Sequence, residues 1–299
     1  MKWVKITDQC SYFSASVNIG YIESNGKGLL IDAGIDDQAA KKVLKTLMEE
    51  NKPITSLFLT HAHSDHFGGA AFLQKKVPHV KTYAPSFEEA IMRNPRLEPI
   101  YLFQGNEPIA SLRNKFLEGP TVDIDEVCDE GKMNIGGLDV MLHSFPGHSY
   151  NQLGLEYDDI LYAADSYFSV ETLIKHRIPF QVDALSTKQS LEKLLTLHVK
   201  GAVPGHGEYD EQFQTTVDEN IRLHEEILQD IVHCLESEGG TMSQDDLLQR
   251  MFQKKNIKLN QLSAYLLYRT AVLAFVSELV KKEILEFCII DYKIYLTQK

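Results

Sequence analysis

The sequence has few cysteines and no long apolar run. Its 299 residues include only four cysteines, which are far apart, so we expect no disulfide framework. Each is predicted to be a small core residue: Cys10, Cys128, Cys234 and Cys288. No stretch approaches about 18 uninterrupted apolar residues, and no secretory apolar core follows Met1. We therefore predict a cytoplasmic protein without a membrane-spanning segment.

Two further absences narrow the chemistry. The sequence contains no Gly-x-Ser-x-Gly motif, so it lacks the nucleophile elbow of many serine hydrolases. It also contains no concentrated run of basic residues, and 30 Lys and Arg against 42 Asp and Glu give a net charge of −12. An acidic protein repels polyanions unless it gathers basic residues locally. The charge disfavours a nucleic-acid partner without excluding one.

Residues 60–69 concentrate metal-binding side chains in the run Thr-His-Ala-His-Ser-Asp-His-Phe-Gly-Gly. The whole chain has 11 histidines, so three within six positions exceed what composition alone would deliver. Imidazole and carboxylate form the ligand set that zinc and iron prefer. The preceding residues 54–60 are apolar and β-forming, which places the donors on a loop at the end of a buried strand. The donors are His61, His63, Asp65 and His66.

Three more donors follow short apolar runs further along the chain. Each occupies the same kind of place, a turn after a predicted strand, and the strands are expected at residues 140–142, 160–162 and 201–203. Any one of them alone would be interpreted as a solvent-exposed loop residue. Together with the first cluster they make a set of seven donors, enough for two metal ions. They are His148, Asp165 and His206.

With these seven residues, the chain resembles the metallo-β-lactamase superfamily over roughly residues 1–210. The resemblance implies a first metal held by His61, His63 and His148, a second held by Asp65, His66 and His206, and Asp165 bridging the two. It implies two Zn²⁺ as cofactors, with Fe or Mn as alternatives. Asp32, in Leu-Ile-Asp-Ala-Gly, matches a supporting carboxylate that would orient a metal-bound imidazole; a simple strand-end turn is the other interpretation.

A dinuclear centre predicts hydrolysis. Two metals about 3.5–4 Å apart can share one water, lower its pKa and stabilise the oxygen that becomes negative in the transition state. We therefore expect a metal-bridging hydroxide to attack the substrate without a side-chain nucleophile. Asp65 is the predicted catalytic proton acceptor, because it is the one carboxylate inside the histidine cluster.

The periodicity of the sequence supports mixed α/β structure, and the resemblance implies an αββα sandwich of two mixed β-sheets flanked by helices. We predict this catalytic domain in residues 1–210, one long connecting helix in residues 211–237 and a winged-helix-like C-terminal domain in residues 241–299. The last part is predicted as helices at 241–252 and 261–282 and a hairpin at 284–296. Its low positive charge argues against DNA recognition, which leaves packing or a homodimer as its role.

Residues 86–120 are rich in apolar residues and proline and are predicted as a helical insertion near the site. The insertion could act as a flap over the substrate, with Tyr101 and Phe103 as wall residues; packing onto the sheet is the equal alternative. Tyr167 and Phe168, just after Asp165, are further predicted pocket residues.

The substrate stays open because this fold hosts many reactions. The first hypothesis is a small-molecule ester, thioester or lactone. Phe168 stands where acyl-homoserine lactonases commonly carry Tyr, which argues against a lactone of that kind. The alternatives of the same fold are a single-stranded RNA endonuclease and a mononuclear iron sulfur dioxygenase. A basic groove would favour RNA, and an enclosed apolar pocket under residues 86–120 would favour a small molecule.

Overall fold

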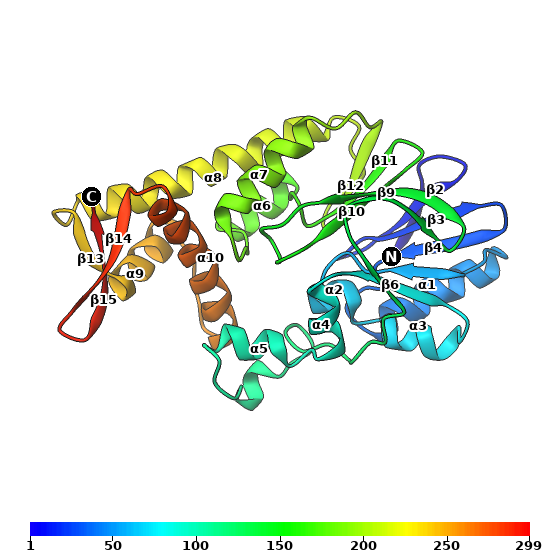
Figure 1. Cartoon of the computed structure of the whole chain (residues 1–299), viewed down its shortest axis with the longest axis horizontal. Coiled ribbons are helices and arrows are strands. Elements are labelled where there is room, and N and C mark those ends of the chain that lie inside the picture. Colours follow the sequence, from blue (N-terminus) through cyan, green and yellow to red (C-terminus); the bar gives the residue numbers. More distant parts are fainter.

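The computed structural model describes all 299 residues. Two β-sheets lie at the centre of the larger part of the molecule (Figure 1). The first sheet has seven strands in sequential order, antiparallel from β1 to β4 and parallel from β4 to β7. Its strands are β1 (Lys2–Lys5), β2 (Cys10–Ser14), β3 (Ile19–Ser24), β4 (Lys27–Ile31), β5 (Ser56–Phe58), β6 (Lys81–Pro85) and β7 (Glu126–Cys128).

The second sheet has five strands in the order β12-β11-β10-β9-β8. It is also mixed, since β11 and β12 are parallel and the other pairs are antiparallel. Tight turns at residues 136–137 and 158–159 join β8 to β9 and β10 to β11 as hairpins. The strands are β8 (Gly131–Ile135), β9 (Leu138–Ser144), β10 (Leu153–Tyr157), β11 (Ile160–Ala164) and β12 (Gly201–Pro204).

Helices cover the outer face of each sheet, which confirms the αββα sandwich. Helices α1 (Asp37–Glu49) and α3 (Ala70–Lys76) share a core with the first sheet, and α7 (Ala184–Leu195) and α8 (Phe213–Glu236) share one with the second. A third apolar cluster lies between the two sheets. Helix α1 begins after Asp36, whose carboxylate caps it by accepting hydrogen bonds from the Gln38 and Ala39 N–H groups.

The parallel pairs bring the ends of four strands to the same edge of the sandwich. Ile31 of β4 pairs with Phe58 of β5, and Ala164 of β11 pairs with Pro204 of β12. The loops that follow β5, β11 and β12 carry six of the seven predicted donors, because residues after paired parallel strands leave the sheet side by side. His148 lies instead on the loop after β9. The first loop leads into the short helix α2 (Ser64–Phe67).

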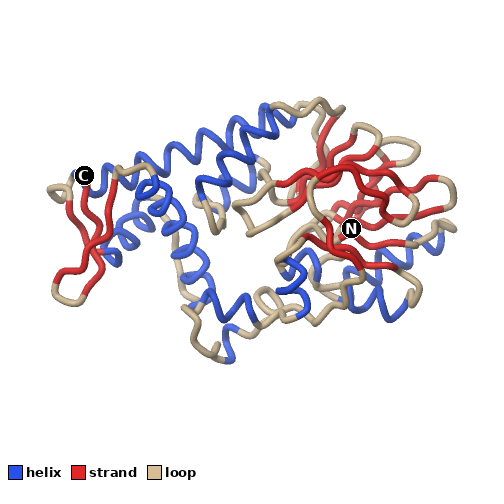
Figure 2. The backbone as a smooth tube through the Cα atoms, in the orientation of Figure 1, coloured by secondary structure: helices blue, strands red, loops and turns tan.

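The predicted insertion at residues 86–120 contains three short helices and reaches toward the C-terminal part of the chain. These are α4 (Glu88–Arg93), α5 (Leu97–Leu102) and the 3₁₀ helix η1 (Ala110–Leu112). Leu102, Leu112 and Leu117 form a small core with Leu266 of α10. Figure 2 shows the blue helices of this segment beneath the end of α10.

The C-terminal residues form helices and a three-stranded sheet of order β13-β15-β14. One sequence prediction is wrong here: residues 241–243 form a strand, not the start of a helix. Helix α9 begins only after Ser243, whose hydroxyl caps it by accepting from the Asp246 N–H. A winged-helix-like domain of its own stays a prediction. The elements are β13 (Thr241–Ser243), α9 (Gln244–Lys254), α10 (Leu262–Lys281), β14 (Leu285–Ile290) and β15 (Lys293–Gln298); α6 (Val170–His176) precedes them.

Candidate metal centre

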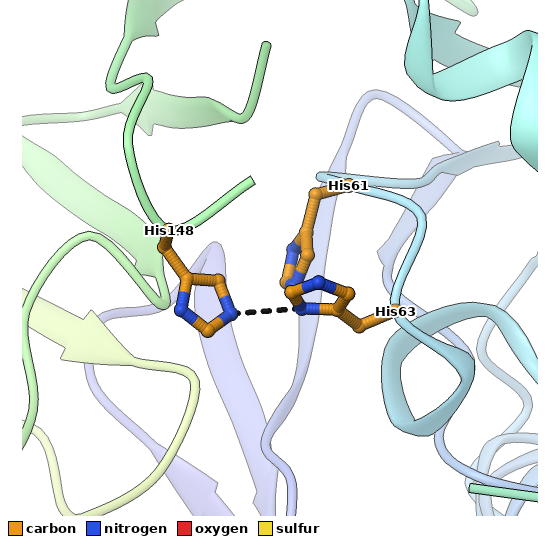
Figure 3. A group of neighbouring side chains, drawn as sticks. All are labelled: His61, His63 and His148. Atoms are coloured by element: carbon orange, nitrogen blue, oxygen red, sulfur yellow. Dashed lines mark hydrogen bonds between the residues drawn. The ribbon is translucent and has the colours of Figure 1, made fainter. Parts of the chain in front are cut away.

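The structure brings all seven predicted donors together at this one edge. They form three overlapping groups, and within each group the ligand atoms lie within 4.8 Å of one another. Figure 3 shows the first group, in which three imidazole rings from two loops point toward a common centre. The groups are His61, His63 and His148; His61, His66 and Asp165; and Asp65, His66 and His206.

The Asp165 carboxylate lies between the first and third groups. Its Oδ1 is 3.3 Å from Nε2 of His66, and its Oδ2 is 3.3 Å from Nε2 of His148 and 3.4 Å from Nε2 of His206. Asp65 closes the third group with its Oδ2 3.6 Å from Nε2 of His206. One carboxylate is therefore within reach of both candidate metal positions.

A buried chain of hydrogen bonds fixes two of the histidines. The His66 Nδ1–H donates to Oδ2 of Asp32 at 2.7 Å, and the Thr60 hydroxyl and N–H both donate to Asp32. Nδ1 of His61 lies 3.0 Å from the Thr60 hydroxyl oxygen. Asp32 adopts a positive φ of 65°, a conformation that costs energy and is held here by its bonds. Asp32 therefore lies where the sequence placed it, behind the cluster.

Backbone carbonyls orient two further histidines. The His148 Nδ1–H donates to the Phe180 carbonyl at 2.9 Å, and the His206 Nδ1–H donates to the Ser16 carbonyl at 2.6 Å. Each bond selects the tautomer whose Nε2 lone pair faces the cluster, which is the arrangement found around metal-bound imidazoles. Sequence reasoning gave no signal for either partner, because both use main-chain atoms of distant loops.

The site has the electrostatics of a cation site. Burial, reinforced by the neighbouring imidazoles, holds the pKa of His61 and His63 well below the usual value and keeps both rings neutral, as metal ligation requires. Nε2 of His66 and Oδ1 of Asp165 are buried and lack a partner with hydrogen-bonding geometry. Such atoms are costly unless a ligand satisfies them. A Cβ at Gly205 would lie 1.9 Å from Oδ1 of Asp165, so this position needs glycine. The residues present therefore fit bound metal ions.

Glu88 is a buried residue of the site that the sequence did not reveal. Its Oε2 accepts from the Ala62 N–H at 2.9 Å, and its Oε1 accepts from the Ser149 hydroxyl at 2.8 Å and the Asn151 N–H at 2.7 Å. The side chain is 1% exposed. It therefore joins the loop of His61 and His63 to the loop of His148. An acidic residue in a predicted helical insertion carries no sequence signal for this role.

A cavity of about 1380 Å³ opens from the cluster and extends to the C-terminal helix α10. Its lining includes five of the seven donors and, from the insertion, Glu98, Phe116 and Leu117. Further apolar lining comes from the segment Ile178, Pro179 and Phe180, from α10 and from other loops around the cluster. The five donors are His63, Asp65, His148, Asp165 and His206.

Of the four predicted pocket residues, Phe168 lines the cavity and the other three do not. Tyr101 and Phe103 pack against the small leucine core between the insertion and α10. Tyr167 is 2% exposed and packs behind the site, where its ring lies 6.1 Å from that of Phe213. The insertion does reach the cavity, as expected, but through other residues.

The comparison with known families agrees with this site. The sequence model of the metallo-beta-lactamase superfamily matches residues 15–206, well over half of the chain. The chain belongs to the metallo-beta-lactamase superfamily. Two of its curated relatives are named as a hydrolase and as a thioesterase.

Two curated relatives show how similar the sequence is to proteins of known activity. A hydroxyacylglutathione hydrolase of Rhodopseudomonas palustris (strain BisB5) is 30% identical over 141 residues, which cover 46% of this chain and 44% of the relative. An atrochrysone carboxyl ACP thioesterase of Aspergillus fumigatus is 26% identical over 203 residues, 67% of this chain and 54% of the relative. The chain thus spans about half the length of the curated relatives it matches.

Solved structures share the whole fold. A beta-lactamase domain protein from Burkholderia ambifaria superposes with a TM-score of 0.76 at 17% identity and covers 100% of this chain and 94% of its own. A metallo-beta-lactamase family protein from Thermus thermophilus gives 0.71 at 16% identity and covers 99% of this chain and 97% of its own. Both likenesses extend through the C-terminal helices and sheet.

Proposed function

We propose that the chain is a zinc-dependent hydrolase that cleaves a small ester or thioester with an apolar acyl group. The observation that carries this proposal is the convergence of seven metal donors beside a cavity whose wall includes apolar residues of the insertion and of α10. The name of one relative, a thioesterase, supports the thioester within this class.

The proposed ligands follow the geometry of the three donor groups. His61, His63 and His148 would hold one ion; Asp65, His66 and His206 would hold the other; and Asp165, within reach of both groups, would contribute its carboxylate to both sites. Two such ions lower the pKa of a shared water and stabilise negative charge on a carbonyl oxygen. Asp65 lines the cavity, so its carboxylate can accept a proton from that water and return it to the leaving group.

Helix α10 supports an apolar substrate because it carries two apolar stripes. The first stripe lines the cavity with Ala264, Leu267, Tyr268 and Ala271, spaced i, i+3, i+4 and i+7. The second, with the same spacing, lies in the core: Val272, Phe275, Val276 and Leu279. Because two of its faces are apolar, α10 has the length and mean hydropathy of a membrane-spanning helix. An acyl chain that extends from the metal centre along the cavity would contact the first stripe.

The charge of the cavity supports a small molecule over RNA. Apart from the metal donors, its lining has four carboxylates and only one Lys or Arg side chain, Lys175. A groove that tracks a phosphate backbone needs the opposite balance. The insertion and α10 also bound the cavity, which suits a small molecule better than a long polymer.

The test combines metal analysis and a hydrolase panel on one preparation. We expect about two zinc ions per chain and turnover of aryl esters or thioesters. His63→Ala and Asp165→Ala should remain folded, bind less metal and lose turnover. His233→Ala is the matched control, because this histidine lies on α8 with its side chain 71% exposed. One iron per chain, or wild-type turnover in either site variant, would contradict the proposal.

A further inference from the structure

Glu98 is a buried glutamate that faces the cavity without a partner. It is the second residue of α5 and is 3% exposed. It lines the same cavity as Asp65 and Phe168. It is absent from the three groups of donors close enough to share a metal ion, so it is not accounted for by the metal centre.

No protein group satisfies the Glu98 carboxyl. Burial, and then the carboxylates of Asp65 and Glu88, raise the pKa of Glu98 well above its usual value, with no hydrogen bond or cation to oppose them. Glu88, a buried glutamate of the same insertion, differs because it accepts three hydrogen bonds. A buried carboxyl without a partner is destabilising, and native proteins keep such groups where a ligand or a reaction uses them.

The remaining charges of the cavity favour a positive ligand group. Its other carboxylates outside the metal donors are Glu171, Glu208 and Asp210, and its one lysine is Lys175. Two metal ions held by Asp65 and Asp165 would retain positive charge at the inner end only. A substrate with a carbonyl at the metals and a cation further along the cavity would match both regions.

We propose that Glu98 binds a primary ammonium group of the substrate and selects amine-bearing esters or thioesters over neutral ones. The proposal rests on the hydrolase function for its substrate but on Glu98 alone for its selectivity. The carboxylate and the ammonium would form a charge-assisted hydrogen bond in a site shielded from water, where such bonds are strongest. Glu98 is therefore a specificity residue, separate from the groups that act on the carbonyl.

The first experiment compares two esters that differ at one position. p-Nitrophenyl 6-aminohexanoate and p-nitrophenyl heptanoate have a terminal ammonium and a terminal methyl group at the same place. The zinc-loaded wild type should show a KM about tenfold or more lower for the ammonium ester, with similar kcat, as expected for one charged hydrogen bond. Glu98→Gln should remove this preference by raising the KM for the ammonium ester to about that for the heptanoate.

The second experiment measures binding without turnover. By calorimetry, n-hexylammonium should bind the wild type at least about tenfold more tightly than 1-hexanol, and Glu98→Gln should bind both equally. Glu107→Gln is the matched control in both experiments, because Glu107 lies on the same insertion with its side chain 70% exposed. It should retain the wild-type preference.

The outcomes separate this proposal from the hydrolase function. If neither ester is cleaved but hexylammonium binds selectively through Glu98, the ammonium site stands and the choice of ester is wrong. Equal binding of hexylammonium and hexanol to the wild type would overturn the proposal without the need for any variant. An equal loss for both esters in folded Glu98→Gln would also overturn it, because that result indicates a structural role.

Discussion

Replacing Glu88 by glutamine should weaken the metal centre without changing any metal donor. The Glu88 carboxylate joins the Ala62 N–H, between two donor histidines, to the loop that follows His148. The three donors of the first group therefore come from two loops held together by one side chain. Their geometry depends on it, because residues that orient metal ligands govern metal affinity.

The expected magnitude follows from the three bonds. Ser149 and Asn151 both donate to Oε1, so the amide oxygen of glutamine should take that side. The new NH₂ group then faces the Ala62 N–H, which loses its acceptor. A buried donor without an acceptor costs about 1–3 kcal/mol, and the free energy of unfolding should fall by this amount. Zinc affinity should fall about 10–100-fold, as for other residues that support metal ligands.

Urea denaturation of the metal-free protein measures the stability, and competition with a chromophoric chelator measures the zinc affinity. Glu89→Gln is the control, since Glu89 is the next residue of α4 and pairs with Arg93 in a partly exposed ion pair. Its effect should stay within about 1 kcal/mol, with unchanged zinc affinity. Wild-type zinc affinity in folded Glu88→Gln would refute the reasoning.

Two further predictions concern α10 and the packing of α8 on α9. Leu279→Ala, in the core stripe, should lower the free energy of unfolding by about 2–5 kcal/mol. Leu267→Ala, in the cavity stripe, should lower it less and should raise the KM for an apolar ester about tenfold. Equal effects of the two variants on stability and on KM would contradict the two-stripe assignment. Burial alone would raise the pKa of Asp230, but the bonds of its carboxylate to Lys255 and Lys254 lower the pKa below 3.8. The ionised Asp230 therefore stabilises the fold above that pH, and this stabilisation is lost as the pH falls through the folded pKa. Asp230→Asn should therefore cost about 1–2 kcal/mol at pH 7 and progressively less below about pH 3.8 in urea denaturation, and a difference independent of pH would contradict this.

The convergence of the donors could be predicted because it depends on local rules. A histidine or aspartate just after a strand of a parallel pair must emerge at the carboxyl edge, and β4, β5, β11 and β12 all end there. Helix starts were also predictable where a side chain caps them, as Asp36 caps α1 and Asp183 caps α7. The start of α9 was missed because Ser243, the residue that caps it, also pairs in a strand.

The cavity could not be predicted because its walls meet only in the folded chain. Glu98, Phe180 and Leu267 belong to three segments far apart in the sequence, and nothing in any one of them indicates the others. Choosing wall residues by aromatic type selected Tyr101 and Phe103, which pack against the leucines of the insertion instead. The type of a side chain predicts that it is buried, but the residues against which it packs depend on the tertiary fold.

The contacts of residues 241–299 argue that this part serves the site, whether or not it is a domain of its own. Its core includes Ile178 and Ala184, which flank the segment whose Phe180 carbonyl orients His148. Helix α10 thus contacts the rest of the protein through that core, through the wall of the cavity and through Leu266 in the small core of the insertion. A change in α10 can reach the substrate directly and the metal centre through Phe180. The specificity of the proposed hydrolase should therefore vary with the C-terminal residues, while its chemistry depends on the seven donors.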